Sequence, residues 1–255
     1  MAFDAAGWTG LTFKALHLDF DWVLVTLSWA FTWLFYTHDR LNISESDQIN
    51  NPKRSAWYAA AQRFLKPIML GVSIGILGLV SMRLSILLPV LVGIIPCLLY
   101  AKKLTIGRFS FTLKGLPGMK ALLVAFLWVI LTVIFPVICT KSPLPSNSVL
   151  LSFCLMVSCF IILQINTNDL RDIEGDKQEG VKSFAVLLGD KNARLLGLSF
   201  IVAGIFFGWQ LFNPVSLILF GFLLALRTIF YEKQNDIYWQ FFISIQGVVA
   251  FILLT

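Results

Sequence analysis

Residues 148–176 read SVLLSFCLMVSCFIILQINTNDLRDIEGD, and this stretch decides the fold. Residues 148–165 carry no charge, and as a helix they are long enough to cross the roughly 30 Å hydrocarbon core of a bilayer. The residues that follow are acidic, with aspartates at positions 169, 172 and 176. The stretch therefore predicts a membrane-spanning helix that ends in a cluster of carboxylates.

The spacing of this acidic cluster favours a cation site. If the helix continues, steps of three and four residues place Asp169, Asp172 and Asp176 along one stripe. Like charges at these spacings repel each other, so the cluster requires a cation or basic partners. Carboxylate oxygens are ligands that Mg²⁺ takes in combination with substrate phosphates. The cluster predicts a magnesium–diphosphate site at a membrane surface.

The composition of the whole chain is that of a membrane protein. Hydrophobic residues make up 58% of the 255 residues, charged residues make up 13%, and the mean hydropathy is +0.81. Ala2 to Leu18 forms a shorter apolar segment, which Asp4 and Lys14 interrupt. Longer apolar segments occur at about 22–37, 67–82, 84–101, 121–140, 148–165, 195–212, 214–231 and 237–255. We expect an all-α polytopic transmembrane bundle of about nine spans, eight clear and one short, forming a single domain over residues 1–255.

The distribution of basic residues predicts the orientation. If nine helices alternate, the loops near 38–66, 102–120, 168–194 and 227–236 share one side and hold all but three of the 20 lysines and arginines. The exceptions are Lys14, Arg83 and Lys141. The positive-inside rule places these loops in the cytoplasm and the C-terminus on the opposite side. The net charge of +6 is thus explained by topology and anionic lipid headgroups, without a nucleic-acid partner.

Two cytoplasmic loops, near 38–62 and 166–194, have the same organisation. The first contains YTHDRLNISESDQINNPKR over residues 36–54, and the second contains the acidic cluster. Each places acidic residues at a helix end and basic residues about a dozen positions later. This pattern suggests an internal pseudo-repeat. The two acidic clusters would then meet across the bundle and share cations with one diphosphate.

The second loop resembles a known motif. Residues 168–189, NDLRDIEGDKQEGVKSFAVLLG, resemble the second aspartate-rich motif, DxxDxxxD, of the UbiA-type intramembrane prenyltransferases, together with its downstream Gly, Lys-Ser and Leu-Leu-Gly elements. The helix count and short loops extend the resemblance along the chain. The first motif of that family is NDxxDxxxD, and alignment on Asp39 places His38, Asn42 and Ser46 at three of its positions. Asp47 lies beside the lost acidic position.

The resemblance implies a function and a set of site residues. It implies Mg²⁺-dependent transfer of a prenyl group from a prenyl diphosphate to a hydrophobic acceptor in the membrane, of the aromatic or quinone-precursor type. Asp169, Asp172 and Asp176 would be catalytic metal ligands. A second, weaker metal site would use Asp39, Asp47 and Asn42. The residues expected to bind diphosphate are Lys102, Lys103, Arg171, Lys177 and Lys182.

Other functions remain open at this stage. A terpene cyclase of the same fold would ionise the same diphosphate and quench the cation within the substrate. The divergent first motif fits a homologue that binds lipid or assists assembly without turnover. A cation transporter has less support, because the sequence places no carboxylate near the centre of a span.

Overall fold

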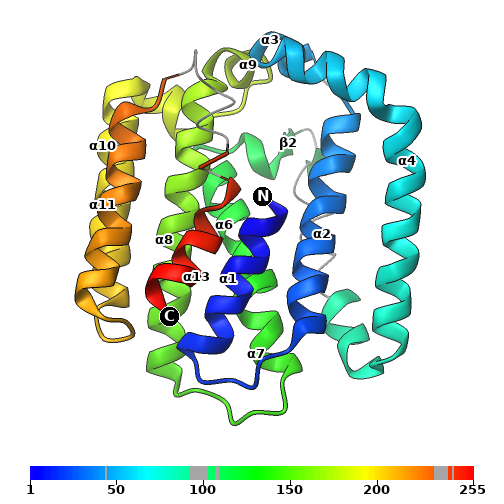
Figure 1. The fold of residues 1–255 in the computed structure, drawn as a ribbon. Coiled ribbons are helices and arrows are strands. Elements are labelled where there is room, and N and C mark those ends of the chain that lie inside the picture. The colour runs from blue at the N-terminus through cyan, green and yellow to red at the C-terminus, as the bar shows by residue number, and fades with distance from the viewer. Residues whose placement is uncertain (44, 92–102, 107–108, 233–240, 243) are drawn as a thin grey trace.

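The computed structural model describes the whole chain except residues 44, 92–102, 107–108, 233–240 and 243, and it is a bundle of helices (Figure 1). The first half contains α1 (Ala2–Ala15), α2 (Trp22–Leu41), α3 (Glu45–Asn50), α4 (Pro52–Ser81), the 3₁₀ turn η1 (Leu84–Ile86), β1 (Lys103–Ile106), β2 (Phe109–Thr112) and the 3₁₀ turn η2 (Leu113–Gly115). The second half contains α6 (Met119–Val129), the π-helical turn η3 (Ile130–Ile134), α7 (Phe135–Cys139), α8 (Asn147–Arg171), α9 (Ile173–Gln178), α10 (Phe184–Gly208), α11 (Pro214–Phe230) and α13 (Gln246–Leu254).

Four of these helical segments are long and apolar enough to cross a membrane, namely Pro52–Ser81, Met119–Cys139, Asn147–Arg171 and Phe184–Gly208. The apolar helix α11 is shorter. The protein is therefore an integral membrane protein built mainly from helices. The total of about nine spans stays a prediction, because segments 84–101 and 237–255 fall partly outside the described residues.

Several helices extend beyond their predicted segments. Helix α4 begins at Pro52 rather than near residue 67, so much of the predicted 38–62 loop is helical. Proline suits this first helical position, because its missing N–H has no partner there. Helix α10 begins at Phe184 rather than near residue 195, and Gly189, with φ of 75°, kinks it. The apolar segments therefore mark only part of each helix, and the helices continue into the polar ends.

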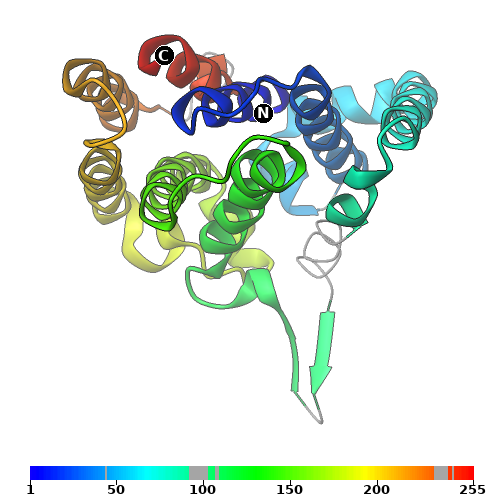
Figure 2. The ribbon, with the colours of Figure 1, turned by 90° about the horizontal axis from the view of Figure 1, so that it is seen from below.

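A β-hairpin occupies much of the predicted 102–120 loop and is an exception to the all-α prediction. Strands β1 and β2 pair antiparallel, with Leu104 opposite Phe111 and Thr105 opposite Ser110. Both strands are rich in β-branched and aromatic residues, which favour extended structure. Figure 2 shows the hairpin projecting away from the helices.

Helix α8 lies at the centre of the packing and contacts α6 and α10, while α1 packs against α2 and α13. Phe160 of α8 stacks on Trp8 of α1, with ring centroids 6.2 Å apart, and meets Phe220 of α11 edge-on at 5.1 Å. Gly204 of α10 lies so close that a Cβ there would be 2.8 Å from the Phe160 ring. Small residues of this kind allow close helix packing in membranes.

A buried carboxylate links α1 to the rest of the bundle. Asp4 is fully buried and accepts a hydrogen bond of 2.6 Å from Gln164 Nε2 of α8. It also accepts one from the backbone N–H of Gly247, in the first turn of α13. The expectation that no carboxylate lies near the centre of a span did not cover this residue. It considered span centres, whereas Asp4 lies in the first turn of a short helix enclosed by the bundle.

Candidate active site

The two motif loops meet where α3 contacts α9, at the top of the bundle in Figure 1. Asn50 donates a hydrogen bond of 3.4 Å to the backbone oxygen of Asp172 and accepts one of 3.1 Å from the N–H of Gly175. Asn51 donates to Asp172 Oδ1 at 3.4 Å. The two loops thus meet through neutral amides rather than first-motif carboxylates, and the expected meeting of the two acidic clusters stays a prediction. Sequence reasoning missed both asparagines, although the quoted NNPKR segment contains them.

The second motif does not form one continuous helical stripe. Helix α8 ends at Arg171 and α9 starts at Ile173, with Asp172 between them at φ −96° and ψ 12°. Asn50 bonds to Asp172 at the break and to Gly175 in α9, and these contacts hold α9 against α3. The prediction of a single stripe is therefore wrong for Asp172, because the helix breaks at this residue.

The side chain of Lys120 joins the other two motif carboxylates. Its Nζ lies 2.7 Å from Asp169 Oδ1 and 2.9 and 2.8 Å from Asp176 Oδ1 and Oδ2. The side chain of Asp169 is 1% exposed and that of Asp176 is 10% exposed. Sequence reasoning counted Lys120 only in the charge bias. Its place directly before the apolar segment 121–140 was the available signal.

The downstream part of the second motif fixes the start of α6, which carries Lys120. Gly118, directly before α6, has φ of 69° and donates a hydrogen bond of 2.8 Å to the backbone oxygen of Lys182. A Cβ on Gly118 would lie 2.7 Å from Cε1 of Phe184. Glycine therefore provides both the left-handed backbone and the space that this contact requires.

Asp172 is paired with its neighbour. Arg171 donates from Nε to Asp172 Oδ1 at 2.6 Å and from Nη2 to Oδ2 at 2.8 Å, which is a bidentate ion pair. Burial alone would raise the pKa of Asp172, but the Arg171 guanidinium outweighs burial and holds the pKa below its usual value. Asp172 is therefore a stable anion at neutral pH.

The remaining predicted residues have varied positions. Asp47 forms an ion pair of 3.5 Å with Arg54 at the start of α4. Asp39 and Asn42 are exposed at the end of α2, where the Asn42 amide donates to the backbone oxygen of His38 at 3.1 Å. Of the predicted diphosphate ligands, Lys177 and Lys182 have exposed side chains, and Lys102 lies outside the described residues. Lys103 is the first residue of β1.

The donor set fits a divalent cation by its chemistry. Asp169 Oδ2 is buried and has no hydrogen-bond partner within the described part of the chain, so one hard oxygen is available to a cation. In the same part of the chain, no three His, Cys, Asp or Glu side chains form a group that could hold a metal ion. Asp169 and Asp176 could together hold a divalent cation, and Lys120 contacts both of them.

Comparison with known proteins identifies the family. A model of the UbiA prenyltransferase family matches residues 66–245, which include Lys120 and the whole second motif. The chain belongs to the UbiA prenyltransferase family. Family membership implies prenyl transfer in the membrane as the general activity. Asp39, Asn42 and Asp47 lie outside the matched residues. No curated protein and no solved structure matches the chain.

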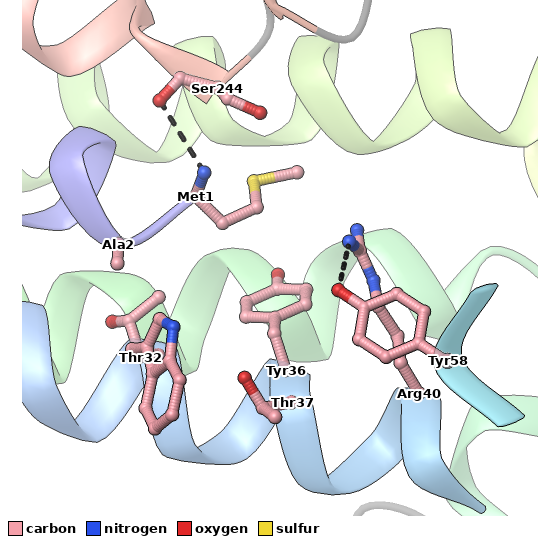
Figure 3. A pocket seen from close by; sticks show the side chains of 9 residues that line it. Met1, Ala2, Thr32, Tyr36, Thr37, Arg40, Tyr58 and Ser244 are labelled. Carbon is pink, nitrogen blue, oxygen red and sulfur yellow. Dashed lines mark hydrogen bonds between the residues drawn. The ribbon is translucent and has the colours of Figure 1, made fainter. Parts of the chain in front are cut away.

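This UbiA protein also has a cavity of about 140 Å³ beside its first motif (Figure 3). Arg40 of α2 donates a hydrogen bond of 3.2 Å to the Tyr58 hydroxyl of α4 at the cavity wall. Among the described residues that line it, none carries a carboxylate; they are Met1, Ala2, Thr32, Trp33, Tyr36, Thr37, Arg40, Tyr58 and Ser244. A protein cavity of about 150 Å³ can hold one benzene ring. The cavity therefore has the size of a single aromatic ring and a lining that suits an anionic or oxygen-bearing one.

Proposed function

We propose that this UbiA protein transfers a prenyl group from a prenyl diphosphate to an aromatic or quinone-precursor acceptor in a Mg²⁺-dependent reaction. The observation that carries this proposal is the cluster of Asp169, Asp176 and Lys120 at one end of an apolar helical bundle. In the same region the two motif loops contact each other where α3 meets α9. A diphosphate headgroup would bind at this charged end. Its prenyl chain would lie among the apolar helices.

Residues of both motifs have proposed roles. When Mg²⁺ is bound, it stabilises the negative charge that develops on the leaving diphosphate oxygens. Asp169 and Asp176 would hold the metal, and Asp172, which is ion-paired with Arg171 at the break between α8 and α9, is the proposed third ligand. Asp39, Asp47 and Asn42 are proposed for a second, weaker site. Arg171 keeps Asp172 ionised and oriented. Arg171 is also a proposed diphosphate ligand, together with Lys102, Lys103, Lys177 and Lys182.

The reaction requires that the carbon–oxygen bond of the prenyl diphosphate breaks and that diphosphate leaves. The acceptor ring then forms a bond to the allylic carbon and loses a proton. The size of the cavity supports an acceptor headgroup of one ring, and Arg40 would attract an anionic or oxygen-bearing substituent on it. Tyr36 and Tyr58 supply aromatic faces in the same cavity, and such faces stabilise cations. We further propose that the motif loops lie on the cytoplasmic side and the C-terminus on the other.

The test is prenyl transfer in isolated membranes with a prenyl diphosphate, Mg²⁺ and a set of monocyclic and bicyclic aromatic acceptors. The Asp176→Asn and Asp172→Asn variants should lose activity by roughly 100-fold or more, as expected when a group that stabilises the transition state is removed. The Asp190→Asn variant is the matched control, because this carboxylate is 56% exposed and lies on α10. Full activity in both site variants would exclude the proposed site.

The same experiment separates the rival functions. A cyclic hydrocarbon or alcohol formed without an acceptor would indicate a terpene cyclase. Diphosphate binding without any product would indicate a binding or assembly protein, which the exposed positions of Asp39 and Asn42 favour.

A further inference from the structure

The ammonium group of Lys120 uses its full hydrogen-bonding capacity on two carboxylates. It lies 2.7 Å from Asp169 Oδ1 and 2.9 and 2.8 Å from the two carboxylate oxygens of Asp176. A lysine ammonium has three N–H donors and no acceptor. In this arrangement Lys120 therefore has no donor left for a diphosphate.

The same contacts oppose a metal ion that arrives alone. The Asp169 and Asp176 side chains are 1% and 10% exposed, so water screens their mutual repulsion poorly and Lys120 compensates it. A divalent cation on these oxygens would lie close to the Lys120 ammonium in a site of low effective dielectric. Mg²⁺ must therefore displace this ammonium, which requires a new partner for it.

A diphosphate provides that partner. Two carboxylates and one ammonium carry a net charge of minus one, so the site repels a free diphosphate as well as competing with a free metal. A diphosphate that binds together with Mg²⁺ offers oxygens to Lys120 and leaves the carboxylates to the metal. The flexible four-carbon stem of lysine permits this exchange. The Asp169 Oδ2 atom, which has no hydrogen-bond partner among the described residues, is available for the first contact with the metal.

We infer that Lys120 is a built-in counterion that makes binding of the metal and the diphosphate interdependent. With neither bound, it holds Asp169 and Asp176 in place. With both bound, it contacts the diphosphate. This inference rests on the proposed function, since it concerns the same site. Each ligand then raises the affinity for the other by the same factor.

Equilibrium dialysis of the purified full-length protein in detergent tests the inference, with Mn²⁺ as the probe and with or without inorganic pyrophosphate. The wild type should retain Mn²⁺ at least tenfold more tightly when pyrophosphate is present. Lys120→Met should bind Mn²⁺ alone at least tenfold more tightly than the wild type and lose most of the pyrophosphate effect. Lys191→Met removes the same charge from an exposed position of α10 and should behave as the wild type.

The outcomes separate this inference from the proposed function. A wild type that binds Mn²⁺ equally well with and without pyrophosphate overturns the inference and leaves the diphosphate site in place. A wild type that binds no pyrophosphate, with or without metal, overturns the proposed function. Lys120→Gln keeps a polar side chain of similar length and serves if Lys120→Met does not fold. Unchanged interdependence in the Lys120 variants also contradicts the inference.

Discussion

Filling the cavity beside the first motif should prevent acceptor binding and leave diphosphate binding intact. Thr37 lines this cavity and is 6% exposed. A Thr37→Phe substitution adds one aromatic ring to a space of about 140 Å³, which is close to the roughly 150 Å³ that hold a benzene ring. The new side chain and the acceptor ring therefore cannot occupy the cavity together.

The magnitude follows from the burial that the acceptor loses. Burying one aromatic side chain contributes about 1.5–3 kcal/mol, and about 1.4 kcal/mol corresponds to a tenfold change in affinity. We expect the KM for the acceptor to rise by about 10- to 100-fold, with little change in the KM for the prenyl diphosphate. Steady-state prenyl transfer in membranes, with each substrate varied in turn, measures both constants.

The matched control is Thr26→Phe, which makes the same substitution at an exposed position of the same helix. Poor folding of the Thr37→Phe variant would lower the maximal rate for both substrates alike, and so it is distinguishable from loss of the acceptor site. An unchanged KM for the acceptor in a folded Thr37→Phe variant would refute the assignment of this cavity.

Two further predictions concern packing and charge. Gly204→Leu should lower the free energy of unfolding by about 1–3 kcal/mol through overpacking, because a Cβ there would lie 2.8 Å from the Phe160 ring. Gly78→Leu is the control and should change little, because that position has open space. Thermal unfolding in detergent compares the two variants, and equal melting temperatures would contradict the packing argument. The pKa of Asp172 is lowered by Arg171 against the effect of burial, so the stability that this pair provides is complete above the usual carboxyl pKa and is lost as the pH falls through the lowered one. Melting temperatures between about pH 6 and pH 3 should fall less steeply for Asp172→Asn than for the wild type, and parallel curves would count against the pairing.

Local sequence pattern located one half of the candidate site. Charge spacing and the downstream glycine and Lys-Ser elements identified Asp169, Asp172 and Asp176, because these features lie within one short segment. Lys120 belongs to a different helix, and its contact with the carboxylates arises only when α6 packs on α8. The sequence shows only that Lys120 directly precedes an apolar segment, and it does not show which residues Lys120 contacts.

The first motif shows a different limit of sequence reading. Comparison by acidic residues led to Asp39 and Asn42, which are exposed at the end of α2. The contacts with the second motif come from Asn50 and Asn51, whose amides bond to backbone and side-chain atoms of the neighbouring segment. A search for metal ligands ranks charge above hydrogen-bonding geometry and so passes over neutral amides. The helical membrane architecture is confirmed, because long apolar segments can be recognised by length and hydropathy alone, whereas the count of about nine spans stays a prediction.

The Asp4 contacts have a consequence for how the chain assembles during synthesis. The side chain bonded to Asp4 lies 160 residues later in the chain and the backbone N–H lies 243 residues later. An unpaired carboxylate is expensive within a bilayer, so α1 should remain near the membrane surface while the intervening helices insert. Its final docking then awaits α13, and the ribosome must finish most of the protein before the first helix reaches its native place. Truncations at the C-terminus should therefore leave the N-terminus accessible to proteases.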